Sequence, residues 1–274
     1  MSEEPANLLS PKERLGIGWL LGQTFARLAR DFLGLWALVF LPTLADVALW
    51  FAYLEIAEAA SPSPDVISLF AVSVVSAALY GLGAGALATR LGARTEDRPL
   101  LWAALRRSFA AFRAHTAYAL LSAVFFIPPL VVMVGSFGPT PTAVLFLVAG
   151  GIYLGLLSTI ALVPAIAAGE TSARAALRRS LELSKGHRLG LAVALTLILF
   201  ADLICLLAGV FLVGITAEAL PISWLFETPI AIFLAAVALA FGHALGGTLL
   251  ALIHRRLVEL KDGYQPEEVA AHFD

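Results

Sequence analysis

The chain has 274 residues, of which 60% are hydrophobic and 14% are charged, and its formal net charge is −2. Soluble domains carry about a quarter charged residues, so this composition indicates a protein embedded in lipid. The nearly balanced charge argues against a nucleic-acid partner. The single cysteine, Cys205, lies in an apolar stretch, which excludes an intramolecular disulfide and a thiolate metal cluster. We therefore expect neither a metal ion nor a cofactor.

Six apolar stretches are predicted to cross a membrane as helices, because each reaches the length of about 20 residues that a span requires. They are 32–57, 65–89, 115–137, 142–167, 189–216 and 228–254. Proline and small polar residues predict three tight hairpins at 61–64, 138–141 and 219–223. The remaining segments are shorter than the roughly 50 residues of a small soluble domain. We therefore expect an all-α integral membrane bundle that forms one domain over residues 1–274.

The positively charged residues predict the orientation of the bundle. All 18 lysines and arginines lie before the first stretch, between the second and third, between the fourth and fifth, or after the sixth. The charged residues of the hairpin tips are acidic, such as Glu55 and Glu218. Because short cytoplasmic segments accumulate Lys and Arg, we expect a multi-pass protein of the cytoplasmic (inner) membrane with both termini in the cytoplasm. The acidic N-terminus lacks a small-residue cleavage site and is not expected to be a signal peptide.

A six-residue segment is repeated in the chain. Residues 103–108 recur letter for letter as 175–180, His115 and His187 follow at the same spacing, and a weaker third copy begins at Trp19. This pattern predicts three units, each an amphipathic interfacial helix followed by a two-span hairpin. The units are 10–90, 96–167 and 171–256, and a short cytoplasmic tail follows at 257–274. Since each unit crosses the membrane twice, we expect a pseudo-threefold axis along the membrane normal.

The second stretch of every unit contains two glycines four residues apart. Such pairs allow helix backbones to approach each other closely. We therefore expect packing roles for Gly81, Gly85, Gly151, Gly155, Gly242 and Gly246.

The predicted interfacial helices are amphipathic and basic. A capping box that includes Ser10 and Glu13 marks the expected start of the first helix. In the second, Trp102, Phe109 and Phe112 lie on one apolar stripe, as in a helix that lies in the headgroup layer. Basic residues there attract anionic lipid, and the candidate contacts are Arg106, Arg107, Arg113, Arg178, Arg179 and Lys185. The alternative is that these helices only cover the cytoplasmic end of the bundle.

Three ionisable residues lie inside the predicted spans: Asp46, Asp202 and His243. Ionisable groups are costly in hydrocarbon, so one interpretation is a proton- or ion-responsive site at a common depth. The other is that each side chain hydrogen-bonds a neighbouring helix as part of the structure. An aspartyl protease is disfavoured, because alanine rather than glycine precedes both aspartates.

Segments 163–170, 176–187 and 257–263 resemble the membrane-domain family named after glycerophosphoryl diester phosphodiesterase. The resemblance implies a membrane domain that, in the phosphodiesterase, accompanies a separate soluble catalytic barrel. No stretch of this chain supplies the length or the acidic and histidine ligands of such a barrel. We therefore expect no phosphodiesterase activity from these residues.

The sequence leaves three functions open. The first is a non-catalytic membrane protein that interacts with anionic lipid headgroups or supports the assembly of other membrane proteins. The second is a proton-coupled or small-solute transporter that uses the intramembrane carboxylates, with helices broken at Pro42 and at Pro128 and Pro129. The third is a lipid-modifying enzyme, although no catalytic motif supports it.

Overall fold

The computed structural model describes residues 16–60, 66–92, 100–134, 139–167, 169, 172–219 and 229–262. Every element in this part of the chain is a helix, which confirms the predicted all-α class. The helices are α1 (Ile17–Ala60), α2 (Val66–Gly92), α3 (Leu101–Ala110), α4 (Phe112–Val134), α5 (Pro139–Ile160), α6 (Val163–Ala167), α7 (Ala173–Ser184), α8 (Arg188–Ala219) and α10 (Pro229–Asp262).

Five of the described segments are long and apolar enough to cross a membrane. They lie in α1, in α2, in α5 together with α6, in α8 and in α10. The predicted third span, 115–137, runs through α4, whose side chains beyond Phe125 lie outside the described residues. The capping box at Ser10 also lies outside them.

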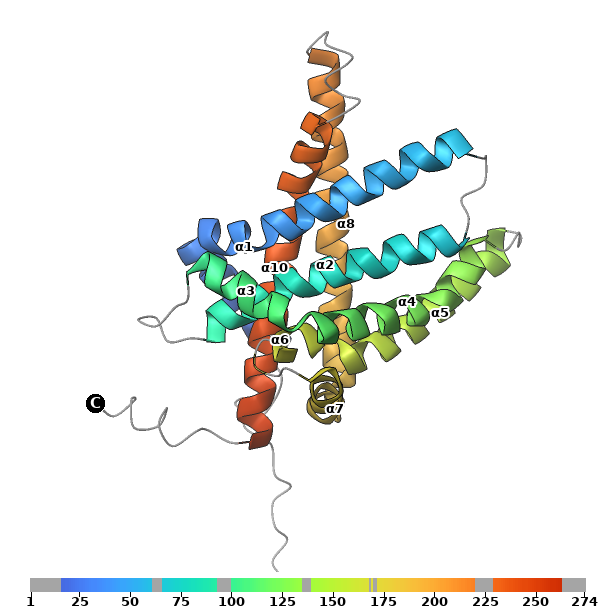
Figure 1. The fold of residues 1–274 in the computed structure, drawn as a ribbon. Coiled ribbons are helices and arrows are strands. Elements are labelled where there is room, and N and C mark those ends of the chain that lie inside the picture. Colours follow the sequence, from blue (N-terminus) through green and yellow to red (C-terminus); the bar gives the residue numbers. More distant parts are fainter. Residues whose placement is uncertain are drawn as a thin grey trace, which may run out of the picture.

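The long helices form pairs that cross one another. In Figure 1, α8 and α10 run along one direction, whereas α1, α2 and the α4–α5 pair cross them steeply. α10 is central, since it packs against α1, α8 and α2. Its buried face includes Ala236, Ala240 and Ala244, and such small side chains let several neighbours approach one helix closely.

Helix breaks occur at other places than the sequence predicted. The first interfacial helix and the span 32–57 are joined in α1, which kinks at Asp31 (φ −136°, ψ 37°). The predicted span 142–167 is interrupted between α5 and α6, because Pro164, in the first turn of α6, cannot donate the backbone hydrogen bond that would continue α5. α1 continues through Pro42, and α4 through Pro128 and Pro129, so the breaks that would favour a transporter do not occur there, and kinking at these prolines is the remaining alternative.

The C-terminal end of α10 holds α7 in place. α10 continues to Asp262, so the first residues of the predicted tail 257–274 are helical. Asp262 forms an ion pair with Arg179 of α7, and Lys261 Nζ donates a hydrogen bond of 2.9 Å to the carbonyl of Lys185. Burial, followed by the charge of Lys261, lowers the pKa of His187 in the turn after α7.

The repeated segment anchors two short helices to the long helices that precede them. Ser108 of α3 is buried and donates a hydrogen bond of 2.7 Å to the carbonyl of Leu82 in α2. The corresponding Ser180 of α7 is buried and donates one of 2.8 Å to the carbonyl of Thr159 in α5. A shared serine therefore performs a shared packing role in these two copies.

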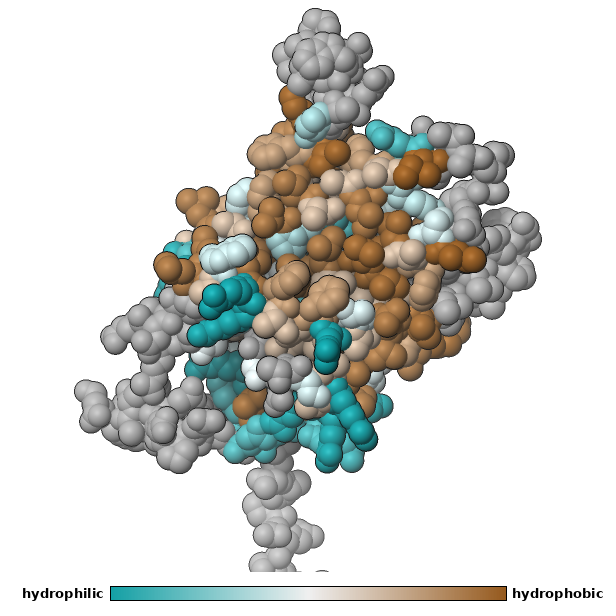
Figure 2. Space-filling view, viewed as in Figure 1, coloured by the Kyte–Doolittle hydropathy of each residue, from teal (hydrophilic) through white to brown (hydrophobic). Residues whose placement is uncertain are grey.

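Hydrophilic side chains gather at one end of the molecule. Figure 2 shows them near the lower edge of the view, while hydrophobic side chains cover most of the described upper surface. We call this the basic end, and define it by cationic residues at the ends of α2 and α10, on α3, at the start of α4, and on or directly after α7: Arg90, Arg106, Arg107, Arg113, Arg174, Arg178, Arg179, Lys185, Arg255, Arg256 and Lys261. The separation of charged and apolar surface is the pattern expected of a membrane protein.

Candidate functional site: a cavity between the long helices

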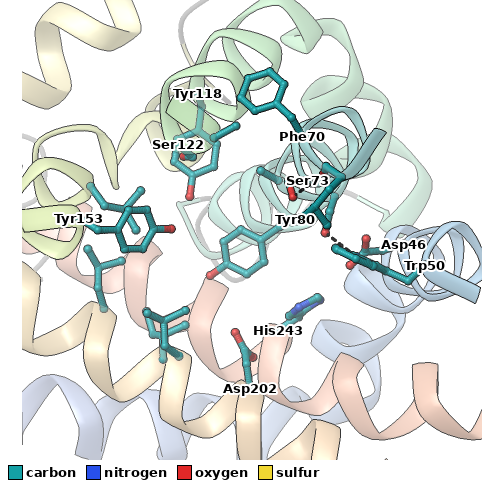
Figure 3. A pocket seen from close by; sticks show the side chains of 18 residues that line it. Asp46, Trp50, Phe70, Ser73, Tyr80, Tyr118, Ser122, Tyr153, Asp202 and His243 are labelled. Carbon is teal, nitrogen blue, oxygen red and sulfur yellow. Dashed lines mark hydrogen bonds between the residues drawn. The ribbon is translucent and has the colours of Figure 1, made fainter. Parts of the chain in front are cut away.

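A cavity of about 580 Å³ lies between the long helices. It is lined by residues from six of them, α1, α2, α4, α5, α8 and α10. Most of the lining is apolar, and its aromatic and polar side chains converge in Figure 3. They are Asp46, Trp50, Phe70, Ser73, Ser76, Tyr80, Tyr118, Ser122, Tyr153, Asp202 and His243. Pockets of this size and character bind small molecules in many proteins.

Asp46 contributes a buried carboxylate from α1. The residue is 6% exposed, and its Oδ1 has no hydrogen-bond partner in the described part of the chain. The carboxylate is hydrogen-bonded with Ser76 of α2, whose hydroxyl also accepts a long hydrogen bond of 3.4 Å from the Trp50 indole N–H. One oxygen of Asp46 is thus left for another donor, and an unmet acceptor in a low-dielectric site is costly.

Asp202 contributes the second carboxylate from α8. A Cβ atom placed on Gly242 of α10 would lie 2.5 Å from Asp202 Oδ1 and 3.2 Å from its Cα. Gly242 therefore provides the space in which this carboxylate lies against α10. Asp202 Oδ1 also has no hydrogen-bond partner in the described part.

His243 of α10 is held by a neighbouring hydroxyl. Thr43 Oγ1 donates a hydrogen bond of 2.8 Å to the carbonyl of Val39, so its only hydrogen is used. The 2.9 Å contact between Thr43 Oγ1 and His243 Nδ1 must therefore have the imidazole as donor. We assign the Nδ1–H tautomer on this basis, which leaves Nε2 as an acceptor. The ring also packs edge-on against Tyr80, with centroids 5.1 Å apart.

The structure brings all three predicted intramembrane residues, Asp46, Asp202 and His243, into the lining of one cavity. The sequence interpretation missed the aromatic residues beside them, of which Trp50, Tyr80 and Tyr153 are examples. Their signal was weak, because aromatic residues are common in apolar spans and nothing local distinguishes a cavity-lining ring from a packed one.

The two described surface helices differ in what they bury. α3 buries the small residues Ala104 and Ser108 and leaves Trp102 71% exposed, with Phe109 of α3 and Phe112 at the start of α4 also exposed. α7 instead buries an apolar face that includes Leu183. A helix that only covered the bundle would bury its large apolar residues, and α7 does so with Leu183 but leaves Leu181 46% exposed, whereas α3 buries no large apolar residue.

The six predicted lipid contacts also fall into two groups, those with and those without partners in the described part of the chain. Arg106, Arg107 and Arg113 are exposed and form no ion pair with another described residue. Arg178 pairs with Glu182 at 2.9 Å, and Arg179 pairs with Asp262. Lys185 is exposed, and its backbone carbonyl accepts a hydrogen bond from the Lys261 ammonium group. Arg178 and Arg179 of α7 thus have acidic partners, although Arg178 remains 82% exposed, whereas Arg106 and Arg107 of α3 and Arg113 at the start of α4 face outward.

Two of the three predicted glycine pairs lie in tight helix contacts, and the third is exposed. A Cβ at Gly85, Gly242 or Gly246 would meet an atom of another helix closer than 3.0 Å, and one at Gly81 would lie 3.2 Å from His115. Gly151 and Gly155 are exposed, and a Cβ at either would meet no atom within 4 Å. Close helix contacts in the described structure therefore involve the pairs of α2 and α10.

Ser108 and His115 form a buried pair that resembles a nucleophile and its base. Ser108 Oγ lies 3.1 Å from His115 Nε2, and both residues are fully buried. However, Ser108 already donates its hydrogen to Leu82, so the imidazole must be the donor. A catalytic pair requires the opposite direction. We interpret these residues as a packing contact.

The described residues contain no group of three or more His, Cys, Asp or Glu side chains that could hold a metal ion. Comparisons with models of known families, with curated proteins and with solved structures found no match to this chain. The family resemblance of segments 163–170, 176–187 and 257–263 therefore stays a prediction from those residues.

Proposed function

We propose that this chain is a non-catalytic protein of the cytoplasmic membrane that crosses the bilayer six times and binds lipid-like molecules. The observation that carries this proposal is the cavity of about 580 Å³ between the long helices. Apolar pockets with a few convergent polar groups are typical binding sites for small molecules. A polar group there would meet the two carboxylates, while an acyl chain would contact the apolar lining.

The same proposal includes three repeated units with both termini in the cytoplasm. It is supported by the order of the described helices, in which α3 and α7 each precede two long helical segments. It is also supported by the cationic residues of the basic end, because cytoplasmic segments accumulate Lys and Arg. Support for the assembly of other membrane proteins belongs to this proposal as a further role.

Filling the cavity is expected to reduce the amount of lipid that the purified protein retains. Ala77 lines the cavity on α2, whereas Ala71 of the same helix is exposed. Ala77→Phe places a ring in the binding space, and Ala71→Phe adds the same ring outside it. Native mass spectrometry of both variants would count the bound lipids. Equal lipid retention in the two variants would contradict the proposed function.

The exposed arginines of α3 and of the start of α4 are expected to give the protein its preference for anionic lipid. Basic residues near an anionic surface gain about 1 kcal/mol each. Replacing Arg106, Arg107 and Arg113 by Gln should therefore reduce the rise in thermal midpoint that added phosphatidylglycerol produces. Arg178→Gln is the control, because Arg178 already pairs with Glu182. A larger loss in the control would show that α7 is the lipid-binding helix.

A second candidate function is a proton-coupled or small-solute transporter. The specific observation in its favour is that Asp46 Oδ1 and Asp202 Oδ1 have no hydrogen-bond partner in the described part. Carboxylates inside a membrane often take part in proton relays. Solute flux into proteoliposomes that Asp46→Asn and Asp202→Asn both abolish would favour this function. The third function, a lipid-modifying enzyme, has no specific support in the described residues.

A further inference from the structure

We infer that the cavity binds hydrophobic monovalent cations, such as amines or quaternary ammonium groups attached to an apolar body. This inference rests on the proposed function and specifies its ligand class. It follows from the charges, the aromatic rings and the unmet acceptors of the cavity.

The charges in the cavity have one sign. Its described lining contains two carboxylates, Asp46 and Asp202, and no lysine or arginine. The cationic residues of the protein are instead concentrated at the basic end. An anionic headgroup in the cavity would have no counter-charge, whereas a cation would have two. Burying a charge without a partner is costly, so the lining selects against anions.

The carboxylates also have unused bonding capacity. Asp46 is more than nine-tenths buried, and its Oδ1 has no partner in the described part. Asp202 Oδ1 has none either. Figure 3 shows the Asp202 carboxylate pointing toward Tyr80 and His243, while its Oδ1 lies against α10 at Gly242. Both Oδ1 atoms are enclosed by protein atoms, so an ammonium group in the cavity would balance the charge of the two carboxylates rather than bond to these two atoms.

Aromatic rings complete a site for an organic cation. Trp50, Phe70, Tyr80, Tyr118 and Tyr153 line the same cavity from four helices. The faces of such rings attract amine and quaternary ammonium ions, and desolvation strengthens this attraction. An apolar body attached to the cation would contact the leucine and isoleucine side chains of α8 that line the cavity.

The same features disfavour an inorganic cation. A hard metal ion requires several oxygen ligands at short distance, and the described residues contain no group of three candidate ligands. A cavity of about 580 Å³ is also much larger than an ion site requires. Its volume and apolar lining suit an organic molecule that carries its own hydrophobic surface.

The test uses two probe ions of nearly equal size and shape but opposite charge. The full-length protein, purified in a non-ionic detergent, is dialysed to equilibrium against tetraphenylphosphonium or against tetraphenylborate, and binding to empty micelles is subtracted. We expect saturable binding of the cation only. Asp46→Asn and Asp202→Asn should each weaken this binding by about tenfold or more, as loss of a buried charge partner does. Glu55→Gln, whose carboxylate lies outside this cavity, should leave it unchanged.

The outcomes separate this inference from the proposed function. Equal binding of the two ions, or unchanged cation affinity in both Asn variants, would overturn the inference. If Ala77→Phe still reduces lipid retention in that case, the proposed function stands without the cation preference. If neither probe nor lipid binding depends on Ala77, both proposals fail. Should an Asn variant not fold, the affinity of Ala77→Phe for tetraphenylphosphonium is measured instead. A weaker affinity would place the site in this cavity, and an unchanged affinity would overturn the inference.

Discussion

Gly85→Ala is expected to destabilise the protein by about 1–3 kcal/mol, the usual cost of overpacking a tight contact. A Cβ at this position would lie 2.5 Å from Ser108 Oγ, 2.9 Å from His115 Cε1 and 2.9 Å from the carbonyl oxygen of Pro164. The last of these is a backbone atom, so it cannot move away by a change of rotamer. The added methyl group would also displace Ser108 from its hydrogen bond to Leu82.

Gly155→Ala is the matched control for this prediction. Gly155 belongs to the equivalent glycine pair of the second predicted unit, but a Cβ there would meet nothing within 4 Å. This variant should be as stable as the wild type or slightly more stable, since alanine favours a helix over glycine. Thermal unfolding in detergent, followed by intrinsic fluorescence, measures both variants. Similar midpoints for the two would show that α2 does not pack as described.

Loss of either partner in the Asp31–Arg90 ion pair is expected to cost about 1–3 kcal/mol, the range for hydrogen bonds to charged groups. Arg90 donates from Nε and Nη2 to Asp31 Oδ2, at 3.0 and 2.8 Å. The side chains are only 16% and 24% exposed, respectively. A Cβ on Gly34 would overlap Asp31 Oδ1, so glycine provides the space for this pair. The pair joins the kink of α1 to the end of α2.

The measurement is a double-mutant cycle of Asp31→Asn and Arg90→Gln, scored by thermal unfolding. The double variant should lose less stability than the sum of the single variants, because each single change leaves a partly buried charge without its partner. Arg178→Gln is the control, since its side chain is 82% exposed in its pair with Glu182. Exposed pairs contribute little. Additive losses in the cycle would mean that the two charges do not interact.

The surface helices illustrate where prediction from the sequence reaches its limit. The identical segments 103–108 and 175–180 predicted a common role for their arginines. Their serines do share a role, since Ser108 and Ser180 both donate to the carbonyl of a preceding long helix. The arginines differ, because acidic partners approach α7 from its own next turn and from the distant end of α10. The local sequence of α7 cannot reveal an acidic partner that lies far away in the chain.

The sequence by itself determined the all-α class, the long apolar helices and the concentration of positive charge between them. These properties depend on the composition and length of each segment. Both can be read from the sequence, because a helix that crosses a bilayer must be long and apolar. It also identified Asp46, Asp202 and His243, because ionisable groups are conspicuous in apolar stretches.

Only the tertiary structure decided which surfaces meet. It placed the three ionisable residues around one cavity with five aromatic rings, paired Arg178 and Arg179 of α7, and made two of the three glycine pairs into close helix contacts. Each of these facts depends on helix rotation and crossing, which are set by packing between distant segments. Gly85 and Gly155 have the same local spacing, but only Gly85 faces a neighbouring helix.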